Sequence, residues 1–587
     1  MKVLLVHPED DLPNRKSLRE WDLIVDLGRA PAATYTRWST QAGCPVISIY
    51  DFAQEMDDLR LCREHLKSGL GFLVDRFGID WWDVLALGFV ADLQQFTLFE
   101  RLSNYLDNRY QLHATRPFWL ATAFQNRRRS KLKVVEGSFG SVRRRLRHYR
   151  RVLGNLDAAQ ISQIAQDKFD RYHAIPRCLS RRTDLSNMPR ILLPTAYVNV
   201  SRMAVRYAEL LPDQEFLLVF ARRSGKVHSL PSNVSAGSLD SYFGRLSGED
   251  APLFYQWGAL HQKLIREESI FEAAEHAGIL KRVESQLQWL LPVRDAWANV
   301  LETENIAGCL SADDTNPYTR IPLLLTKNRG LPTIACHHGA LDCWMTLKTL
   351  ASDFYLAKSE MERDYLVHRC GVVRAGIVLD ARIVRAASGR KMPQSERTHI
   401  VFFTESYENA GWRSEEFYKA LLPHLCSLAQ ICGLRLVLKL HPFDSIRGHR
   451  KMLRRILGAQ AQQIELVAGV PTADLWQRTR FALTVESSTA LECTAREIPI
   501  FLCTWLRDAY SGYVQQYAKF GIGYALSSPE QIADIPDFLK TRNWSPAMAE
   551  ESINPETLET LFSPGAASAA RVKQQTFATC AASPIPL

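Results

Sequence analysis

The stretch FALTVESSTALECTAREIPIFL, residues 481–502, decides the fold class. It opens with a short apolar run typical of a buried strand, and a hydroxyl-rich turn at 486–489 leads into a helix with one apolar face. A second apolar run, 498–504, follows that helix directly. A strand, a helix and a strand in this order predict a parallel sheet crossed by helices.

The same alternation runs through most of the 587 residues and predicts an α/β protein. It consists of two doubly wound, Rossmann-like lobes that follow an N-terminal α/β extension. In doubly wound sheets ligands bind beyond the carboxyl ends of the strands, so residues just after strands are the informative ones. Besides 481–487 and 498–504, the candidate strands are 2–7, 22–28, 45–52, 83–89, 190–197, 215–221, 307–314, 332–338, 353–358, 399–405, 434–442 and 464–469.

Composition shifts set the predicted domain boundaries. The extension spans 1–185, the first lobe 186–380 and the second lobe 395–545. A stretch rich in Arg and Ser after Asp380 reads as the linker between the lobes. The tail, 546–587, is small and polar towards its end and is expected to be partly disordered.

Composition also excludes several classes of protein. The 46% hydrophobic and 23% charged residues are those of an ordinary globular chain, which rules out fibrous and wholly disordered proteins. No run approaches the roughly 18 apolar residues of a membrane span, and the opening MKVLLVHPEDD is too short for a secretory signal. The 12 cysteines are scattered, without the close pairs of a zinc site or disulfide framework. We expect a cytoplasmic protein.

One segment carries the positive charge of the chain. Residues 127–151 contain eleven Lys and Arg against one acid, Glu136, whereas the whole chain has a net charge of +9. Such a cluster indicates a surface for polyanions or anionic lipid headgroups, and the alternative is a solvated helix face. No nucleic-acid recognition motif accompanies it, so we expect no nucleic-acid partner. The segment predicts peripheral attachment to an anionic membrane surface.

Two polar motifs follow neighbouring strands of the second lobe. In LRLVLKLHPFDS the apolar run ends at Lys439, His441 and Pro442, which places an imidazole at the carboxyl edge of a strand. About 45 residues later a second polar motif follows a strand, and its hydroxyls could hold a phosphate at the N-terminus of the next helix. Each motif alone would equally suit a structural turn or cap; together they favour a phosphate site. The second set is Glu486, Ser487, Ser488 and Thr489.

His441-Pro442 followed by Ser487-Ser488-Thr489 resembles the signature of the GT-B bacterial glycosyltransferases that use CMP-activated sialic acid or Kdo and build capsule or lipopolysaccharide. The resemblance covers roughly 190–540. It implies a GT-B fold, a CMP-sugar donor, a glycan or lipid-linked acceptor and a site near the inner membrane. It also implies that His441 contacts or protonates the nucleotide phosphate and that Ser487 and Ser488 hold it.

Further donor contacts are expected from the same lobe. An acid between the two motifs often contacts the ribose in such enzymes, which makes Glu465 a candidate, and Glu486 could also reach the nucleotide. Thr404 and Ser406 follow the first strand of the lobe, where contacts to phosphate or donor sugar are common in this architecture.

The first lobe supplies the predicted catalytic base. Asp313 and Asp314 follow one strand, and His337, His338 and Gly339 follow the next. The His-His-Gly turn is similar to the Gln-His-Gly turn of GT-B polysaccharide enzymes, with His337 in place of Gln. An inverting transferase needs a base for the acceptor hydroxyl, and we assign Asp313 or Asp314, with His338 as support or alternative. The competing interpretation is that the acids cap the next helix.

The absence of several known motifs argues against some classes of enzyme. No GxGxxG opens a helix and no GxxxxGK[ST] is present, which argues against dinucleotide redox and P-loop enzymes. No metal-binding motif is found, so we expect neither a metal nor another cofactor. The predicted function is an inverting glycosyltransferase. The alternatives are a CDP-glycerol-type glycerophosphotransferase, a UDP-sugar epimerase-like protein and a non-catalytic adaptor.

Overall fold

The structure is a computed structural model of residues 1–587. The chain consists of two compact units. The first contains residues 1–58, 93–162 and 385–548, and the second contains residues 59–92, 163–384 and 549–587. The residues described are all except 9, 11, 13–19, 54–72, 86–89, 107–109, 117–132, 135–187, 223–226, 228, 245–249, 268–271, 273, 276–277, 279, 340–351, 369, 371, 381–392, 408–411, 442–443, 507–516, 542–552 and 582–587.

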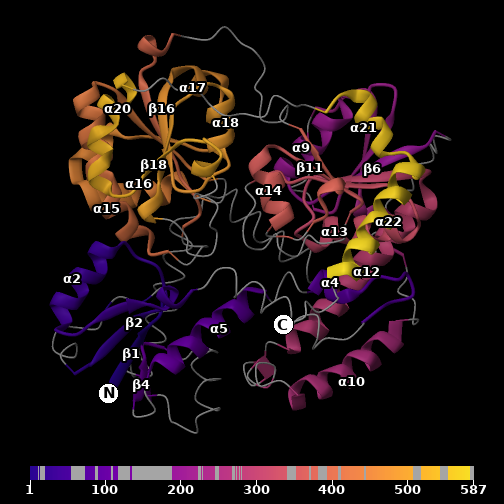
Figure 1. Cartoon of the computed structure of the whole chain (residues 1–587), viewed down its shortest axis with the longest axis horizontal. Coiled ribbons are helices and arrows are strands. Elements are labelled where there is room, and N and C mark those ends of the chain that lie inside the picture. Colours follow the sequence, from indigo (N-terminus) through magenta and orange to yellow (C-terminus); the bar gives the residue numbers. More distant parts are fainter. Residues whose placement is uncertain are drawn as a thin grey trace. The chain divides into compact units, whose positions relative to one another are not determined.

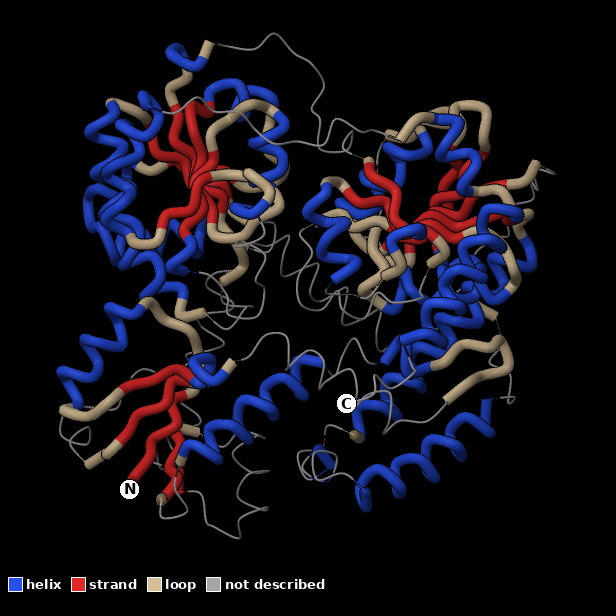
Figure 2. The backbone as a smooth tube through the Cα atoms, in the orientation of Figure 1, coloured by secondary structure: helices blue, strands red, loops and turns tan. Residues whose placement is uncertain are grey.

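The C-terminal lobe, in the first unit, is a six-stranded parallel sheet in the order β15-β14-β13-β16-β17-β18. Helices lie on both faces of it (Figures 1 and 2). Its strands are β13 His399–Phe403, β14 Arg435–Lys439, β15 Glu465–Val467, β16 Thr479–Thr484, β17 Ile500–Cys503 and β18 Tyr524–Leu526. Its helices are α15 Ser414–Cys432, α16 Ile446–Leu457, α17 Ala473–Arg478, α18 Thr489–Ala495 and α20 Ile535–Thr541.

The middle lobe, in the second unit, is a seven-stranded parallel sheet in the order β12-β11-β10-β9-β6-β7-β8. The strands are β6 Arg190–Thr195, β7 Glu215–Phe220, β8 Val234–Ser238, β9 Ile306–Ser311, β10 Thr333–Ala335, β11 Phe354–Ala357 and β12 Ile377–Leu379. The helices are α9 Val198–Ala208, α10 Ala251–Glu267, α12 Lys281–Thr303, α13 Pro317–Asn328, α14 Glu360–His368, α21 Pro555–Leu561 and α22 Pro564–Ala581, with α4 Trp81–Leu85 against α13.

The N-terminal domain, in the first unit, holds a third parallel sheet in the order β3-β2-β1-β4-β5. Its strands are β1 Lys2–Val6, β2 Leu23–Asp26, β3 Val46–Ser48, β4 Gln111–Ala114 and β5 Lys133–Val134, and its helices are α2 Ala32–Ala42 and α5 Val90–Tyr105. The basic segment 127–151 lies outside the described residues apart from the backbone of β5.

The strand orders confirm the predicted fold class. Each sheet begins at an inner strand, runs to one edge and then continues on the other side of the first strand, which is the doubly wound, Rossmann-like order. The central strands were predictable because they are buried on both faces: in β13 of the C-terminal lobe the successive residues Ile400 and Val401 are both completely buried.

One prediction of local structure was wrong. Residues 83–89 were expected to form a strand, but Trp81–Leu85 is the helix α4 and 86–89 lie outside the described residues. The Asp80 carboxylate accepts the Trp82 N–H at 3.0 Å and so starts a helix there. The described part of the tail, 553–581, contains α21 and α22, which bury Leu558, Leu561 and Ala570 against the middle lobe.

Among the helices of the described residues, none combines the length and the apolar character needed to cross a membrane.

Candidate functional site

The strand order fixes where each lobe can bind a ligand. In a doubly wound sheet the helices on either side of the first strand leave in opposite directions, which opens a crevice at the carboxyl ends of the first strand and its new neighbour. That switch point lies between β13 and β16 in the C-terminal lobe and between β6 and β9 in the middle lobe. The two edges are considered separately.

The C-terminal edge is tied together across its switch point. The Thr404 hydroxyl, just beyond β13, accepts the backbone N–H of His441 at 3.0 Å. On the other side, the Glu405 carboxylate accepts the backbone N–H of Glu486 at 2.8 Å. The residues after β13 therefore hold the turns that follow β14 and β16, and the two sequence motifs lie on either side of β13 at the carboxyl edge of the sheet.

The serine motif forms a compact turn. Ser487 accepts the Thr489 N–H at 3.4 Å, and its carbonyl accepts a hydrogen bond from the Tyr517 hydroxyl at 3.2 Å. Ser488 makes no capping bond to α18, which has only seven residues, so its dipole adds little. The Thr489 Oγ1 is buried and has no hydrogen-bond partner among the described residues. A buried hydroxyl without a partner points to a missing polar group at this turn.

Burial lowers the pKa of two basic groups at this edge. Burial, with the nearby Lys439 charge, lowers the pKa of His441 to about 4, so its imidazole is neutral at pH 7. Burial lowers the pKa of Lys439 to about 8, against the opposing effect of Glu492 and Asp444. The Lys439 Nζ donates to the carbonyl of Leu440 at 2.7 Å. Both groups would gain stability from an adjacent anion.

The other residues named for this lobe have different places. Ser406 lies two residues beyond Thr404 and is half-buried. Pro442 lies outside the described residues. The structure does not bring Glu465 to the carboxyl edge: it is the first residue of β15, opposite Val437, and its carboxylate meets the exposed Arg435 at 3.4 Å. Glu465 therefore lies level with the middle of β14, two residues before the carboxyl end of that strand.

In the middle lobe, Asp313 sits just beyond β9 and is 4% exposed. Its Oδ1 accepts hydrogen bonds from the backbone N–H and the hydroxyl of Thr315, and its Oδ2 accepts one from the Asn316 amide at 2.7 Å. Asn316 in turn caps α13 through the Thr319 N–H. The carboxylate thus shapes the helix start, as the structural interpretation of the sequence foresaw, and both of its oxygens keep accepting capacity.

Asp314 lies in the interior of the middle lobe. It is completely buried, and its carboxylate accepts a hydrogen bond from the Tyr355 hydroxyl at 3.2 Å. Its carbonyl accepts the Arg320 guanidinium at 3.1 Å. The side chain therefore ties β9 to β11 and to α13, which suits a structural role.

The His-His-Gly turn lies beside Asp313. Each of Asp313, His337 and His338 offers a ligand atom, and the three atoms lie within 4.8 Å of one another. His337 is buried and accepts the Gly339 N–H on Nδ1 at 3.3 Å, whereas His338 is half-buried. The Lys358 ammonium donates to the carbonyls of His337 and Gly339 at 3.1 and 2.6 Å.

These residues are the described ones that could hold a divalent cation. A buried ammonium against the same turn, and a His337 Nδ1 already engaged, oppose the approach of a second positive charge. A carboxylate beside two imidazoles is equally the arrangement that accepts and holds a proton.

Arg222 is a cationic group at this edge that was not predicted from the sequence. Arg222 follows β7, and its guanidinium donates to the Tyr197 hydroxyl at 3.0 Å and lies 4.7 Å from the ring centre of Tyr318. Tyr197 follows β6 and Tyr318 opens α13. An arginine placed directly after the apolar run EFLLVFA was the available signal. The edge from β7 to β10 thus presents an arginine, an aspartate and two histidines.

No family model and no curated protein matches the chain. Solved structures align with it over about two thirds of its length. They include the S. aureus MnaA–UDP co-structure (14% identity, 68% of this chain and 99% of that chain, TM-score 0.37) and a Neisseria meningitidis UDP-GlcNAc 2-epimerase bound to UDP-GlcNAc (10%, 66% and 99%, 0.38). A glycosyltransferase from Rickettsia africae aligns at 10% identity, over 68% of this chain and 100% of that chain, with a TM-score of 0.35. From its own strand orders, the chain is an α/β protein whose parallel sheets form Rossmann-like lobes.

Proposed function

We propose that the chain is an inverting glycosyltransferase that moves a sugar of the Kdo or sialic acid type from a CMP-activated donor to a bacterial surface polysaccharide or lipid-linked acceptor. The observation that carries the proposal is the crevice of the C-terminal lobe, where Thr404 and Glu405 hold the His441 and Ser487 turns on the two sides of β13. Phosphates bind at such edges of doubly wound sheets.

The charges at this crevice favour a donor with one phosphate. Among the described side chains that follow β13, β14 and β16, Lys439 supplies the positive charge at pH 7 and His441 is neutral. A CMP leaving group needs less compensation than a diphosphate does. The hydroxyls of Ser487 and Thr489 and an N–H of the neutral His441 ring can donate to its phosphate as the bond to the sugar breaks.

On the acceptor side we assign the base to His338. Its ring is the accessible member of the cluster with Asp313 and His337. As the acceptor oxygen bonds to the anomeric carbon, its proton passes to His338, and the anomeric C–O bond breaks with its electrons going to the CMP phosphate. The Asp313 carboxylate stabilises the imidazolium that forms. Arg222 at the same edge favours an acceptor that carries a negative charge.

The first test is nucleotide binding to the whole chain. A thermal-shift screen with CMP, CDP, UDP, GDP and ADP should show selective stabilisation by CMP, about 2.7 kcal/mol at 100 times the dissociation constant. Stabilisation by UDP alone would favour the epimerase-like alternative, and turnover of CDP-glycerol would favour the glycerophosphotransferase. Stabilisation by none of them would overturn the proposal.

The second test is kinetic. His338→Gln and Asp313→Asn should lower kcat by about 10²–10⁴ and about 10-fold respectively, since the first removes the base and the second only its partner. His368→Gln is the matched control, because His368 pairs with Asp364 on the exposed surface of α14 and should have no effect. An adaptor would behave in the opposite way: His338→Gln would leave function intact, whereas neutral substitutions at Arg143, Arg144 and Arg145 would abolish it.

A further inference from the structure

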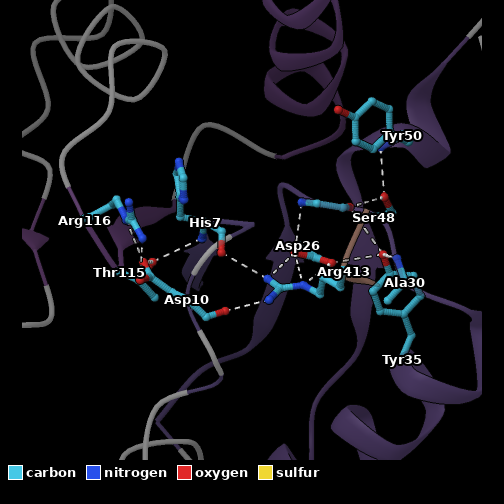
Figure 3. A network of polar contacts seen from close by, with 11 residues as sticks. His7, Asp10, Asp26, Ala30, Tyr35, Ser48, Tyr50, Thr115, Arg116 and Arg413 are labelled. Carbon is cyan, nitrogen blue, oxygen red and sulfur yellow. Dashed lines mark hydrogen bonds and ion pairs between the residues drawn. The ribbon is translucent and has the colours of Figure 1, made fainter. Parts of the chain in front are cut away.

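The N-terminal domain has the same strand order as the two lobes, yet the described polar groups at its carboxyl edge already bind other groups of the protein. The switch point lies between β1 and β4. There the backbone N–H of His7 donates to the Thr115 hydroxyl at 3.1 Å, and that hydroxyl donates to Asp10 at 2.7 Å. Arg116 closes the network with two bonds to the Asp10 carboxylate, at 2.7 and 3.0 Å (Figure 3).

The next strand, β2, ends at Asp26, and this carboxylate receives a group from the C-terminal lobe. The Arg413 guanidinium contacts both Asp26 oxygens, at 2.6 and 3.0 Å. It also donates to the carbonyls of Asp10 and His7 at 2.6 and 3.1 Å (Figure 3). The Asp26 and Arg413 side chains are 0% and 7% exposed, so the ion pair is buried.

The pocket around Asp26 is built to hold a carboxylate in one position. The N–H of Gly28 donates to Asp26 at 3.0 Å, and the Tyr35 hydroxyl donates to its other oxygen at 3.1 Å. Burial beside Asp26 raises the pKa of Tyr35, which keeps the hydroxyl protonated as a donor. The Trp38 ring centre lies 4.8 Å from the Arg413 guanidinium. These contacts preorganise the pocket for an arginine.

The backbone around Arg413 joins the same contact. Trp412 forms a parallel bridge with Arg29, and the Arg413 N–H donates to the Arg29 carbonyl at 2.8 Å. Arg37 on α2 pairs with Glu416 on α15 at 2.6 Å, at the exposed rim of this contact. The N-terminal domain and the start of α15 are therefore joined by a bridge, a buried ion pair and a surface ion pair.

Arg413 ends the segment that begins at the candidate donor crevice. Thr404 and Glu405 hold the His441 and Glu486 turns, and Arg413 lies nine residues after Thr404. Within the segment, the Tyr407 N–H donates to the Glu405 carbonyl at 2.9 Å and the Trp412 N–H donates to the Tyr407 carbonyl at 2.8 Å. The described residues of the segment, 404–407 and 412–413, are thus held at the carboxyl edge of the C-terminal sheet, at Tyr407 and at the N-terminal domain.

We infer that the N-terminal domain is a positioning domain for the donor site: its Asp26 pocket takes Arg413 and thereby holds the described residues 404–407 and 412–413 in the form that binds nucleotide. The inference rests on the proposed function, since it takes the crevice as the donor site. Arg413 is a positioning residue, because it contacts the N-terminal domain and acts on the crevice through Thr404 and Glu405. The carboxyl edge of the N-terminal sheet is used for this contact instead of a ligand.

The test compares Asp26→Asn, Arg413→Gln and Arg413→Lys with Arg37→Gln, which removes only the exposed pair of the same contact. We expect Asp26→Asn and Arg413→Gln to raise the Kd of CMP and the KM of the donor by about tenfold, with kcat within about twofold. The amides of Thr404 and Tyr407 should exchange hydrogen faster. Arg413→Lys should recover part of the affinity, because an ammonium can reach Asp26 but not all three acceptors. Arg37→Gln should match the wild type.

Unchanged exchange at Thr404 and Tyr407 in the two charge-removing variants, with unchanged CMP affinity, would overturn the inference. Where a single variant unfolds, the double variant Asp26→Asn/Arg413→Gln leaves no buried charge without its partner and takes its place. The proposed function fails separately, when the wild-type chain binds no nucleotide. In that case the exchange rates of the same variants still decide whether Arg413 holds the segment.

Discussion

Nucleotide binding at the C-terminal crevice should depend on pH through Lys439. Its pKa of about 8 means that the free protein holds this ammonium about 90% protonated at pH 7 and about 10% protonated at pH 9. A phosphate bound nearby favours the charged form and should return the pKa towards its ordinary value of about 10.4. Binding above pH 8 must then take up a proton.

The size of the effect follows from these values. Restoring the ordinary pKa makes the protein take up about half a proton per CMP bound at pH 8, and the Kd should be about tenfold higher at pH 9 than at pH 7. CMP itself keeps its dianionic phosphate over this range, since the second pKa of such phosphates is about 6. His441, with a pKa of about 4, stays neutral in the free protein throughout.

Isothermal titration of CMP into the whole chain, in two buffers of different ionisation enthalpy at pH 7, 8 and 9, measures both quantities. Lys439→Met is the matched control and should bind more weakly, with no proton uptake at pH 8. Equal Kd values at pH 7 and pH 9, or an uptake that survives in Lys439→Met, would show that the phosphate does not approach this ammonium.

Two further predictions concern stability. Lys439→Met should raise the free energy of unfolding at pH 7 by about 2 kcal/mol, because it removes the cost of holding a buried ammonium and gives up one hydrogen bond. The native pKa lies below the unfolded one, so the wild type gains stability as pH rises from 8 to about 10.4, and urea unfolding should show the difference shrinking there. Arg294→Met should cost about 3–5 kcal/mol in the same assay, because Arg294 is 0% exposed and pairs with three carboxylates. Arg329→Met, which removes a surface pair with Glu302, should cost less than about 1 kcal/mol, and equal losses would contradict the argument.

The strands were predictable where apolar runs are long enough to be buried on both faces. The strands that the sequence did not reveal are short: β4 and β8 have four and five residues, β12 and β18 have three each, and β5 has two. Three residues carry too little periodicity to distinguish a strand from a loop. The apolar run around α4 predicted a strand, but the segment is a helix because the Asp80 carboxylate caps its first turn. The hydrophobic pattern alone does not distinguish the two.

Some residues of the candidate site could be placed from the local sequence, whereas others depend on contacts with distant parts of the chain. A residue directly after a strand, such as His441 or Asp313, reaches the carboxyl edge whatever its neighbours do, and sequence alone placed it there. Glu465 failed because its position depends on where β15 begins to pair with β14. The partner of Asp26 lies 387 residues away in the chain, and no local pattern could connect it to Arg413.

Strand order alone therefore does not say what a doubly wound sheet binds. All three sheets of this chain have the same winding, but each edge carries different chemistry. At the C-terminal edge the buried Thr489 hydroxyl has no partner among the described residues, and burial lowers the pKa of His441 and Lys439, which a bound anion would raise. At the N-terminal edge the Asp26 carboxylate already forms an ion pair with Arg413. An edge whose polar groups gain from an added partner is a candidate ligand site, and on this criterion we propose the C-terminal edge rather than the N-terminal one.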